Sequence, residues 1–379
     1  SLSANGGTIN IGGPAATNST DLFLDGRLEI MAGSINIGTP GTLLNNDIVY
    51  SSGGVPEIII SGGSLFVNGQ IRRGTTINTG SLNYTQSNSS SVVTIAGENA
   101  NPVRGIFEIL NTGSKFTMSG GTLGITGSFN DPSVIDFYLV PDTGNVTGGT
   151  IRFGSADTPA STTFGMVTSV PLFNLEVDAE TNSKILDLKI YPLTLGNDLV
   201  VNGNSSFRAN GLDVTIGGSL VNSNSSAAAG LSSGGYQPGL ITQTTFFNAA
   251  GPGSITGEGS NLTNFANLSV SSADTLSLST NTTIKVSGNM ALLNGVLDDG
   301  ANYIYLLGDL TSDSEHYSPL PEGGISFDGT RSQVIYVGPA GELGNIIINN
   351  HTGISIADNC TINGKLTFSR GLFYIDDYL

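Results

Sequence analysis

Four acidic side chains in the last third of the chain have the chemistry that a metal site needs. They lie close together in the sequence and are Asp309, Asp313, Glu315 and Asp328. Carboxylate oxygens are the ligands that Ca²⁺ prefers, so Ca²⁺ is the ion that they would hold. Their spacing lacks the D-x-D-x-D-G order of a calcium loop. We therefore keep these four residues as candidates for a metal site and otherwise expect no cofactor.

Two pairs of adjacent aspartates follow equivalent strand patterns near the C-terminal end. Asp298-Asp299 lies in L-D-D-G and Asp376-Asp377 in I-D-D-Y. Paired carboxylates suit general acid/base chemistry on a glycosidic bond, or Ca²⁺ binding. Aspartate is also common at solvated corners, where its side chain bonds to nearby backbone. We expect the solvated corner for both pairs.

Histidine and cysteine are too few for most catalytic or metal chemistry. The chain holds His316, His351 and Cys360, and a zinc site needs three or four such ligands. No G-x-S-x-G phrase accompanies either histidine, and no phosphate-binding G-x-x-x-x-G-K-(S/T) loop is present. We expect both histidines in turns or at the surface, Cys360 packed beside a strand, and no catalytic or cofactor-binding residue.

The composition excludes several classes of partner. Thirteen basic and thirty acidic residues give the 379-residue chain a net charge of −17, which disfavours binding to nucleic acid phosphates. No apolar run of membrane-spanning length occurs, and tryptophan is absent. Charged residues make up only 11%, while glycine reaches 53. Such a composition suits a long stack of short strands and tight turns.

One short phrase, Gly-(Ser/Thr)-apolar-x-apolar, recurs in the first part of the chain. Its copies begin at Gly7, Gly33, Gly63, Gly80, Gly121 and Gly149. Most of the steps between them are close to the length of one coil of a solenoid. The glycine is expected to supply a positive φ at a corner, and the two apolar residues to point inward from a strand. No helical periodicity competes with this pattern.

A longer repeat follows. The phrase that begins at Asn174 returns at Asn267 and at Asn345, which gives units of roughly 80 residues. We therefore expect an all-β chain, a right-handed parallel β-helix or β-solenoid, with a tandem array of β-sandwiches as the alternative. Residues 1–155 would form irregular coils, and residues 156–379 three units at about 156–239, 240–318 and 319–379.

The C-terminal part of the chain, from Phe327 onward, resembles a known repeat. It reads F-D-G-T…Q-V-I…G-N-I-I-I-N-N…G-I-S-I…T-I-N-G-K-L-T-F-S-R-G-L-F, and the matching positions are Phe327, Gly329, Gln333, Ile335, Asn345, Asn349, Asn350, Gly353, Ile362, Gly364, Leu366, Phe368, Gly371 and Leu372. This phrase is similar to the repeats of very large secreted surface proteins of Bacteroidota, including adhesin-like cargo of the type IX secretion system. The resemblance implies export, an extracellular, cell-surface location and an extended stalk within a longer chain.

These observations lead to two hypotheses from different classes. The first is a non-enzymatic structural or adhesive stalk segment that extends a binding tip or mediates surface attachment or gliding motility. Its partners would be surface glycans or other cell-surface or secretion proteins, with no nucleic acid and no direct membrane span. The alternative is a carbohydrate-active β-helix enzyme or a glycan-binding module. Convergence of outward acidic, basic and aromatic residues in one groove would favour the alternative, and scatter would favour the stalk.

Overall fold

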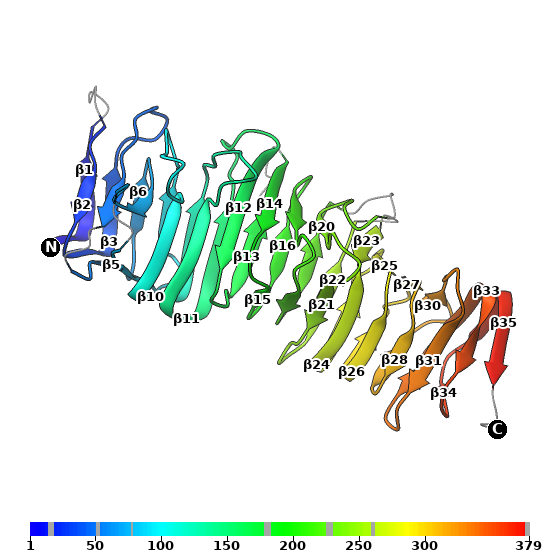
Figure 1. Cartoon of the computed structure of the whole chain (residues 1–379). Coiled ribbons are helices and arrows are strands. Elements are labelled where there is room, and N and C mark those ends of the chain that lie inside the picture. Colours follow the sequence, from blue (N-terminus) through cyan, green and yellow to red (C-terminus); the bar gives the residue numbers. More distant parts are fainter. Residues whose placement is uncertain are drawn as a thin grey trace. The chain divides into compact units, whose positions relative to one another are not determined.

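The computed structural model describes residues 1–13, 19–50, 54–76, 79–177, 183–224, 230–258 and 262–375. Across these residues all regular structure is β-strand, and no helix is present (Figure 1). Contacts divide the chain into two compact units, Ser1–Tyr191 and Pro192–Leu379, which we describe one at a time. We call them unit 1 and unit 2.

Unit 1 is built from fourteen described strands, most of them short. They are β1 (Leu2–Ile11), β2 (Leu22–Leu24), β3 (Arg27–Ile37), β4 (Ile48–Tyr50), β5 (Glu57–Ile60), β6 (Ser64–Val67), β7 (Ile71–Arg73), β8 (Asn83–Gln86), β9 (Val92–Ile95), β10 (Phe107–Ile125), β11 (Phe137–Phe153), β12 (Thr162–Thr168), β13 (Asn174–Val177) and β14 (Lys184–Leu188). Every pairing among them that the described residues give is parallel, and Figure 1 shows neighbouring arrows side by side in the same direction.

The parallel pairs of unit 1 fall into three columns. Column A holds the first halves of β1 and β3, then β5, β8 and the middle of β10. Column B holds the second halves of β1 and β3, then β6, β9, the ends of β10 and β11, and β13. Column C holds β2, β4, β7, the starts of β10 and β11, and the end of β12. In each column, every strand pairs with the next strand along the chain that belongs to the same column.

Column B shows why these residues form strands. Alternate side chains point inward, so that Ile35, Leu65, Val93, Leu123 and Ile151 stack in register, each at most 1% exposed. Full burial of one such side chain contributes about 1.5–3 kcal/mol. A strand of this length cannot bury its apolar face alone, so the stability of each strand depends on the strands above and below it.

The corner glycines behave as the sequence predicts. All six glycines of the recurring phrase have positive φ, from 69° at Gly63 to 132° at Gly80. Gly33 combines a φ of 80° with a close approach, since a Cβ built there would lie 2.3 Å from the carbonyl oxygen of Gly7. The glycines therefore let one corner stack directly on the next.

Unit 2 is built from strands of the same kind. They are β15 (Leu193–Leu195), β16 (Leu199–Val201), β17 (Ser206–Arg208), β18 (Val214–Ile216), β19 (Leu220–Asn222), β20 (Tyr236–Gln237), β21 (Thr244–Phe247), β22 (Gly253–Thr256), β23 (Leu262–Phe265), β24 (Asn267–Leu278), β25 (Thr283–Val286), β26 (Met290–Asp298), β27 (Tyr303–Leu306), β28 (Leu310–Ser312), β29 (Glu315–Tyr317), β30 (Gly324–Phe327), β31 (Gln333–Val337), β32 (Glu342–Leu343), β33 (Ile346–Ile356), β34 (Thr361–Ile362) and β35 (Leu366–Ile375). The pairings that the described residues give here are also parallel.

Two columns of unit 2 show how the longer sequence repeat relates to the strands. Leu268 pairs with Met290, and this column continues through Leu310 and Ile335. Ile346 belongs to a different column, which runs back through Ile325 and Ile304. The equivalent phrases at Asn267 and Asn345 thus occupy different columns. The sequence separation between paired strands is much shorter than the repeat.

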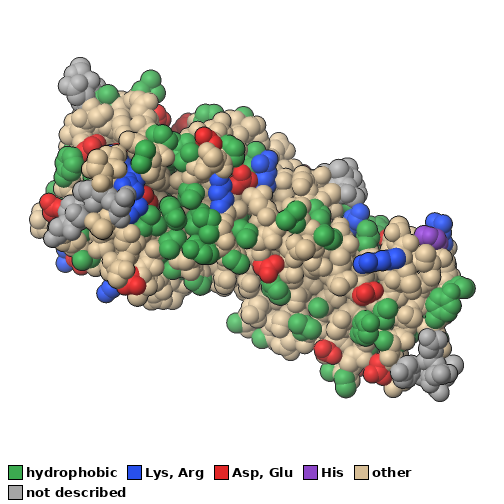
Figure 2. All heavy atoms as spheres, in the orientation of Figure 1, with side chains coloured by type: hydrophobic (Ala, Val, Ile, Leu, Met, Phe, Trp, Pro, Cys, Tyr) green, Lys and Arg blue, Asp and Glu red, His purple; other side chains and the backbone are tan. Residues whose placement is uncertain are grey.

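The expectation of an all-β chain made of short strands is confirmed, and the pairing is parallel throughout the described residues. Within those residues no helix is long and apolar enough to cross a membrane. Figure 2 shows charged side chains scattered over the visible face of each unit, with uncharged surface between them.

Candidate functional site

A groove of about 740 Å³ lies on the described surface of unit 1. Its floor is the outward face of column B, on β6, β9, β10 and β11. Its walls are the segments after these strands, around residues 96–99, 126–130 and 154–160, with Pro40 and Gly41 at one end. The groove therefore crosses four neighbouring strands.

One row of side chains sets the character of the floor. Phe66, Thr94, Gly124 and Arg152 are direct neighbours on successive strands, and Glu176 continues the row on β13. They point outward because the residues on either side of each one point into the core. The row thus runs from an aromatic ring, past a hydroxyl and a bare backbone position, to an ion pair.

The ion pair closes one end of the row. Arg152 Nε lies 2.9 Å from Glu176 Oε2, with the two side chains 39% and 18% exposed. No other hydrogen bond of the Arg152 side chain occurs among the described residues, so its two terminal amino groups are available to a ligand. Glu98 and the exposed Asp157 add acidic charge to the walls.

Hydrogen bonds hold the walls in place. Thr158 Oγ1 donates to the carbonyl of Thr126 at 2.6 Å, which ties two successive wall segments together. Asn99 donates to the carbonyl of Leu43, and Asn45 donates to the carbonyl of Asn99 at 3.2 Å. The groove is therefore formed before any ligand arrives, as most small-molecule sites are.

Of the four carboxylates considered for a metal site, Asp309 and Asp328 accept hydrogen bonds from neighbouring polar groups. Asp309 Oδ1 accepts the backbone N–H of Val334 at 2.8 Å. Asp328 Oδ1 accepts bonds from Ser326 and Asn349, and burial raises the pKa of this carboxyl. Asp313 is exposed and Glu315 half-buried. Across the described part of the chain, no group of three or more His, Cys, Asp or Glu side chains is placed to hold a metal ion.

Asp299 and His316 are where the expectation from sequence was wrong. Asp299 is fully buried and not at a solvated corner, and His316 is 1% exposed on β29 and not at the surface. His316 is placed opposite Leu297, at an inward position of its column, and this explains its burial. Asp376 and Asp377 lie outside the described residues.

The polar contacts of this buried pair define its chemistry. His316 Nε2 lies 3.2 Å from Asp299 Oδ2, while His316 Nδ1 faces the backbone N–H of Gly344 at 3.3 Å. Because Nδ1 accepts, the ring proton lies on Nε2 and is donated to Asp299. Ser318 donates to the same carboxylate oxygen at 2.5 Å, and not to the histidine. A serine nucleophile needs the histidine as its base, so these three side chains are not arranged as a nucleophilic triad.

His351 and Cys360 are the remaining two residues considered in the sequence. His351 is exposed on β33, which confirms the expectation of a surface histidine. Cys360 is half-buried, and burial raises the pKa of its thiol. A raised thiol pKa lowers the thiolate fraction that nucleophilic chemistry requires.

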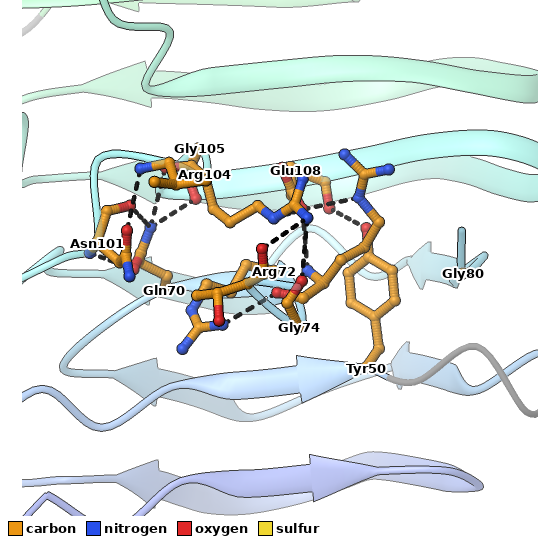
Figure 3. Close-up of polar contacts among 12 residues, drawn as sticks. Tyr50, Gln70, Arg72, Gly74, Gly80, Asn101, Arg104, Gly105 and Glu108 are labelled. Carbon is orange, nitrogen blue, oxygen red and sulfur yellow. Dashed lines mark hydrogen bonds and ion pairs between the residues drawn. The ribbon is translucent and has the colours of Figure 1, made fainter. Parts of the chain in front are cut away.

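A buried cluster of charges in unit 1 was not predicted from the sequence (Figure 3). Arg72 Nε lies 2.6 Å from Asp47 Oδ2, and Arg73 Nε lies 3.0 Å from Glu108 Oε1. Arg104 Nε is 3.9 Å from the same Glu108 oxygen. All five side chains are at most 10% exposed. Burial raises the pKa of Asp47, and the Arg72 charge opposes that rise.

Neutral groups complete this cluster. The Gln70 amide donates to the carbonyls of Asn101, Arg104 and Gly105, as Figure 3 shows. The Tyr50 hydroxyl donates to the Glu108 carbonyl at 3.0 Å. The cluster thus ties β4, β7 and β10 to the segment before β10. Its charged side chains are nearly fully buried and bond to one another, so we assign the cluster to stability.

No model of a known protein family matches the chain, and comparison with curated proteins and with solved structures gives no match.

Proposed function

We propose that this chain is a β-solenoid segment that acts as a non-enzymatic structural and adhesive stalk of a large extracellular surface protein. The observation that carries the proposal is the parallel register of the columns. Successive strands in one column, such as those of Ile35, Leu65 and Val93, recur at nearly even intervals along the chain and share one continuous core. Stacked coils with nearest-neighbour contacts give such columns a simple origin.

The chemistry of the chain supports a mechanical role. Each coil is held by backbone hydrogen bonds to its two neighbours and by an apolar core that continues between them. The buried ion pairs of Glu108 and Asp47 add bonds between separate strands. The cluster that most resembles a catalytic group, Asp299 with His316 and Ser318, is occupied by contacts within the core. A segment of this kind would keep a distal module or binding surface away from the cell.

Single-molecule pulling tests the proposal against the tandem-sandwich alternative. The full chain is held between two handles and extended at constant speed. A solenoid should unravel in steps of one coil, which for roughly 20 to 36 residues release about 7 to 13 nm of extended chain. β-Sandwiches of roughly 80 residues would instead release about 28 nm per event. A record that contains only events of about 28 nm would contradict the solenoid.

Surface labelling tests the cellular side of the proposal. Antibodies raised against the purified segment are applied to intact and to permeabilised cells that produce the protein. Equal labelling of both is the expected result for an extracellular segment. Labelling that requires permeabilisation would refute the surface location and leave the pulling result untouched.

A further inference from the structure

We infer that the groove of unit 1 is a binding site for a neutral oligosaccharide. The site does not depend on the stalk function, because a solenoid of any role can carry a groove. The floor of the groove, its polar groups and its charge together indicate this ligand class.

The floor of the groove is long and shallow. Phe66 and Arg152 are three strand spacings apart, which is about 14 Å. Gly124 lies between them in the row, although glycine is uncommon inside β-strands. Its backbone does not need glycine, since it has no positive φ and a Cβ would meet only the Val93 carbonyl oxygen, at 3.6 Å. The missing side chain therefore keeps the groove open.

The chemistry along the row fits a sugar chain. The half-buried Phe66 ring and the 43% exposed Val92 beside it form an apolar patch that can pack against the C–H face of a pyranose. Thr94 follows with a hydroxyl, and Arg152 follows with its free terminal amino groups. Sugar hydroxyls both donate and accept, so one ligand can satisfy these groups in turn.

Charge and topology argue against other ligands. Glu98 and Asp157 outnumber the one basic side chain of the groove, Arg152, whose charge Glu176 already balances. Phosphate chains and acidic sugars are therefore disfavoured. An extended peptide would add to a free strand edge, but β6, β9 and β10 are each paired on both sides.

The experiment uses the full chain, isothermal titration calorimetry and four neutral hexasaccharides, β-1,4-linked glucose, mannose, xylose and galactose. An oligogalacturonate of equal length serves as the charged counterpart. We expect at least one neutral hexasaccharide to bind and the charged one to bind more weakly. No binding by any neutral hexasaccharide, or preference for oligogalacturonate, overturns the inference.

Two variants locate the site. Gly124→Val should fill the groove without backbone strain, and Phe66→Ala should remove its apolar patch; each is expected to weaken binding about tenfold or more. Their controls are Gly26→Val and Phe23→Ala, at exposed positions outside the groove, which should leave binding unchanged. Thermal unfolding of all four variants is recorded. Equal affinities in the variants and their controls, with folding intact, refute the groove as the site.

Discussion

Removal of the Glu108 charge tests whether the buried cluster of unit 1 stabilises the fold. Glu108 is 2% exposed, and one of its oxygens faces both Arg73 and Arg104. Glu108→Gln keeps the size of the side chain and an oxygen that can accept the backbone N–H of Arg73, now 2.9 Å away. The substitution therefore changes the charge while most of the packing stays.

The expected loss follows from the burial of the two arginines. Their side chains are 8% and 7% exposed, so water cannot replace the lost carboxylate. Breaking a buried pair by removal of one partner costs about 3–5 kcal/mol, because an uncompensated charge stays in the interior. We expect about 3 kcal/mol for Glu108→Gln, since the amide still accepts one bond.

The chain provides a matched control for this substitution. Glu29 pairs with Arg27 at 2.5 Å in the same unit, but the side chains are 23% and 45% exposed. Exposed pairs contribute about 0.2–1 kcal/mol, so Glu29→Gln should cost less than about 1 kcal/mol. Urea unfolding followed by circular dichroism gives both values, and hydrogen exchange in β7 and at the start of β10 localises the loss. Equal losses for Glu108→Gln and Glu29→Gln would show that water reaches the cluster, and would refute the reasoning.

Two further substitutions test burial and the corners. Burial raises the pKa of Asp136 from 3.8 to about 6, although hydrogen bonds from the Gly165 and Phe129 backbone oppose the rise. The protonated carboxyl therefore contributes stability to the folded state below pH 3.8. This contribution, about 3 kcal/mol, is lost as the pH rises to 6. Relative to wild type, Asp136→Asn should therefore gain stability in urea from pH 4 to pH 6; a constant difference would contradict the raised pKa. Gly33→Ala should destabilise unit 1 by at least about 1 kcal/mol in the same assay because of its positive φ and close approach, whereas Gly26→Ala, with nothing within 4 Å, should change stability by less than about 0.5 kcal/mol. Equal effects at the two glycines would refute the close stacking of corners.

The recurring Gly-(Ser/Thr)-apolar-x-apolar phrase predicts the corners well and the columns only in part. Five of its six copies lie in column B, but Asn83 of the Gly80 copy pairs with Glu57 and Lys115 in column A. The corresponding strand of column B begins at Val92. Val92 follows Ser91, with no glycine before the serine, so this strand does not match the phrase. Inward alternation is the same in every column, so the phrase alone cannot tell which column a strand joins.

Ser91 shows why a glycine rule misses some corners. Its hydroxyl donates to the Asn88 carbonyl and accepts from the Gln86 amide at 3.1 Å, so side-chain bonds fix this corner. The same limit applies to the longer repeat of the second part of the chain. Its phrases at Asn267 and Asn345 share their alternation but occupy different columns.

The buried polar groups mark the point where a single sequence stops being informative. Alternation predicts which residues of a strand share a face, but in the three-residue strand β29 it does not show that His316 points inward; its pairing with Leu297 does. Alternation also cannot predict whether an outward face stays exposed. Arg72 and Glu108 become buried because the segment that Gln70 anchors, ahead of β10, packs beside their strands. That covering depends on contacts between residues far apart in the sequence, which local patterns do not encode. The groove over Gly124 is the reverse case, since the neighbouring wall segments stand around the floor and leave it open to a ligand.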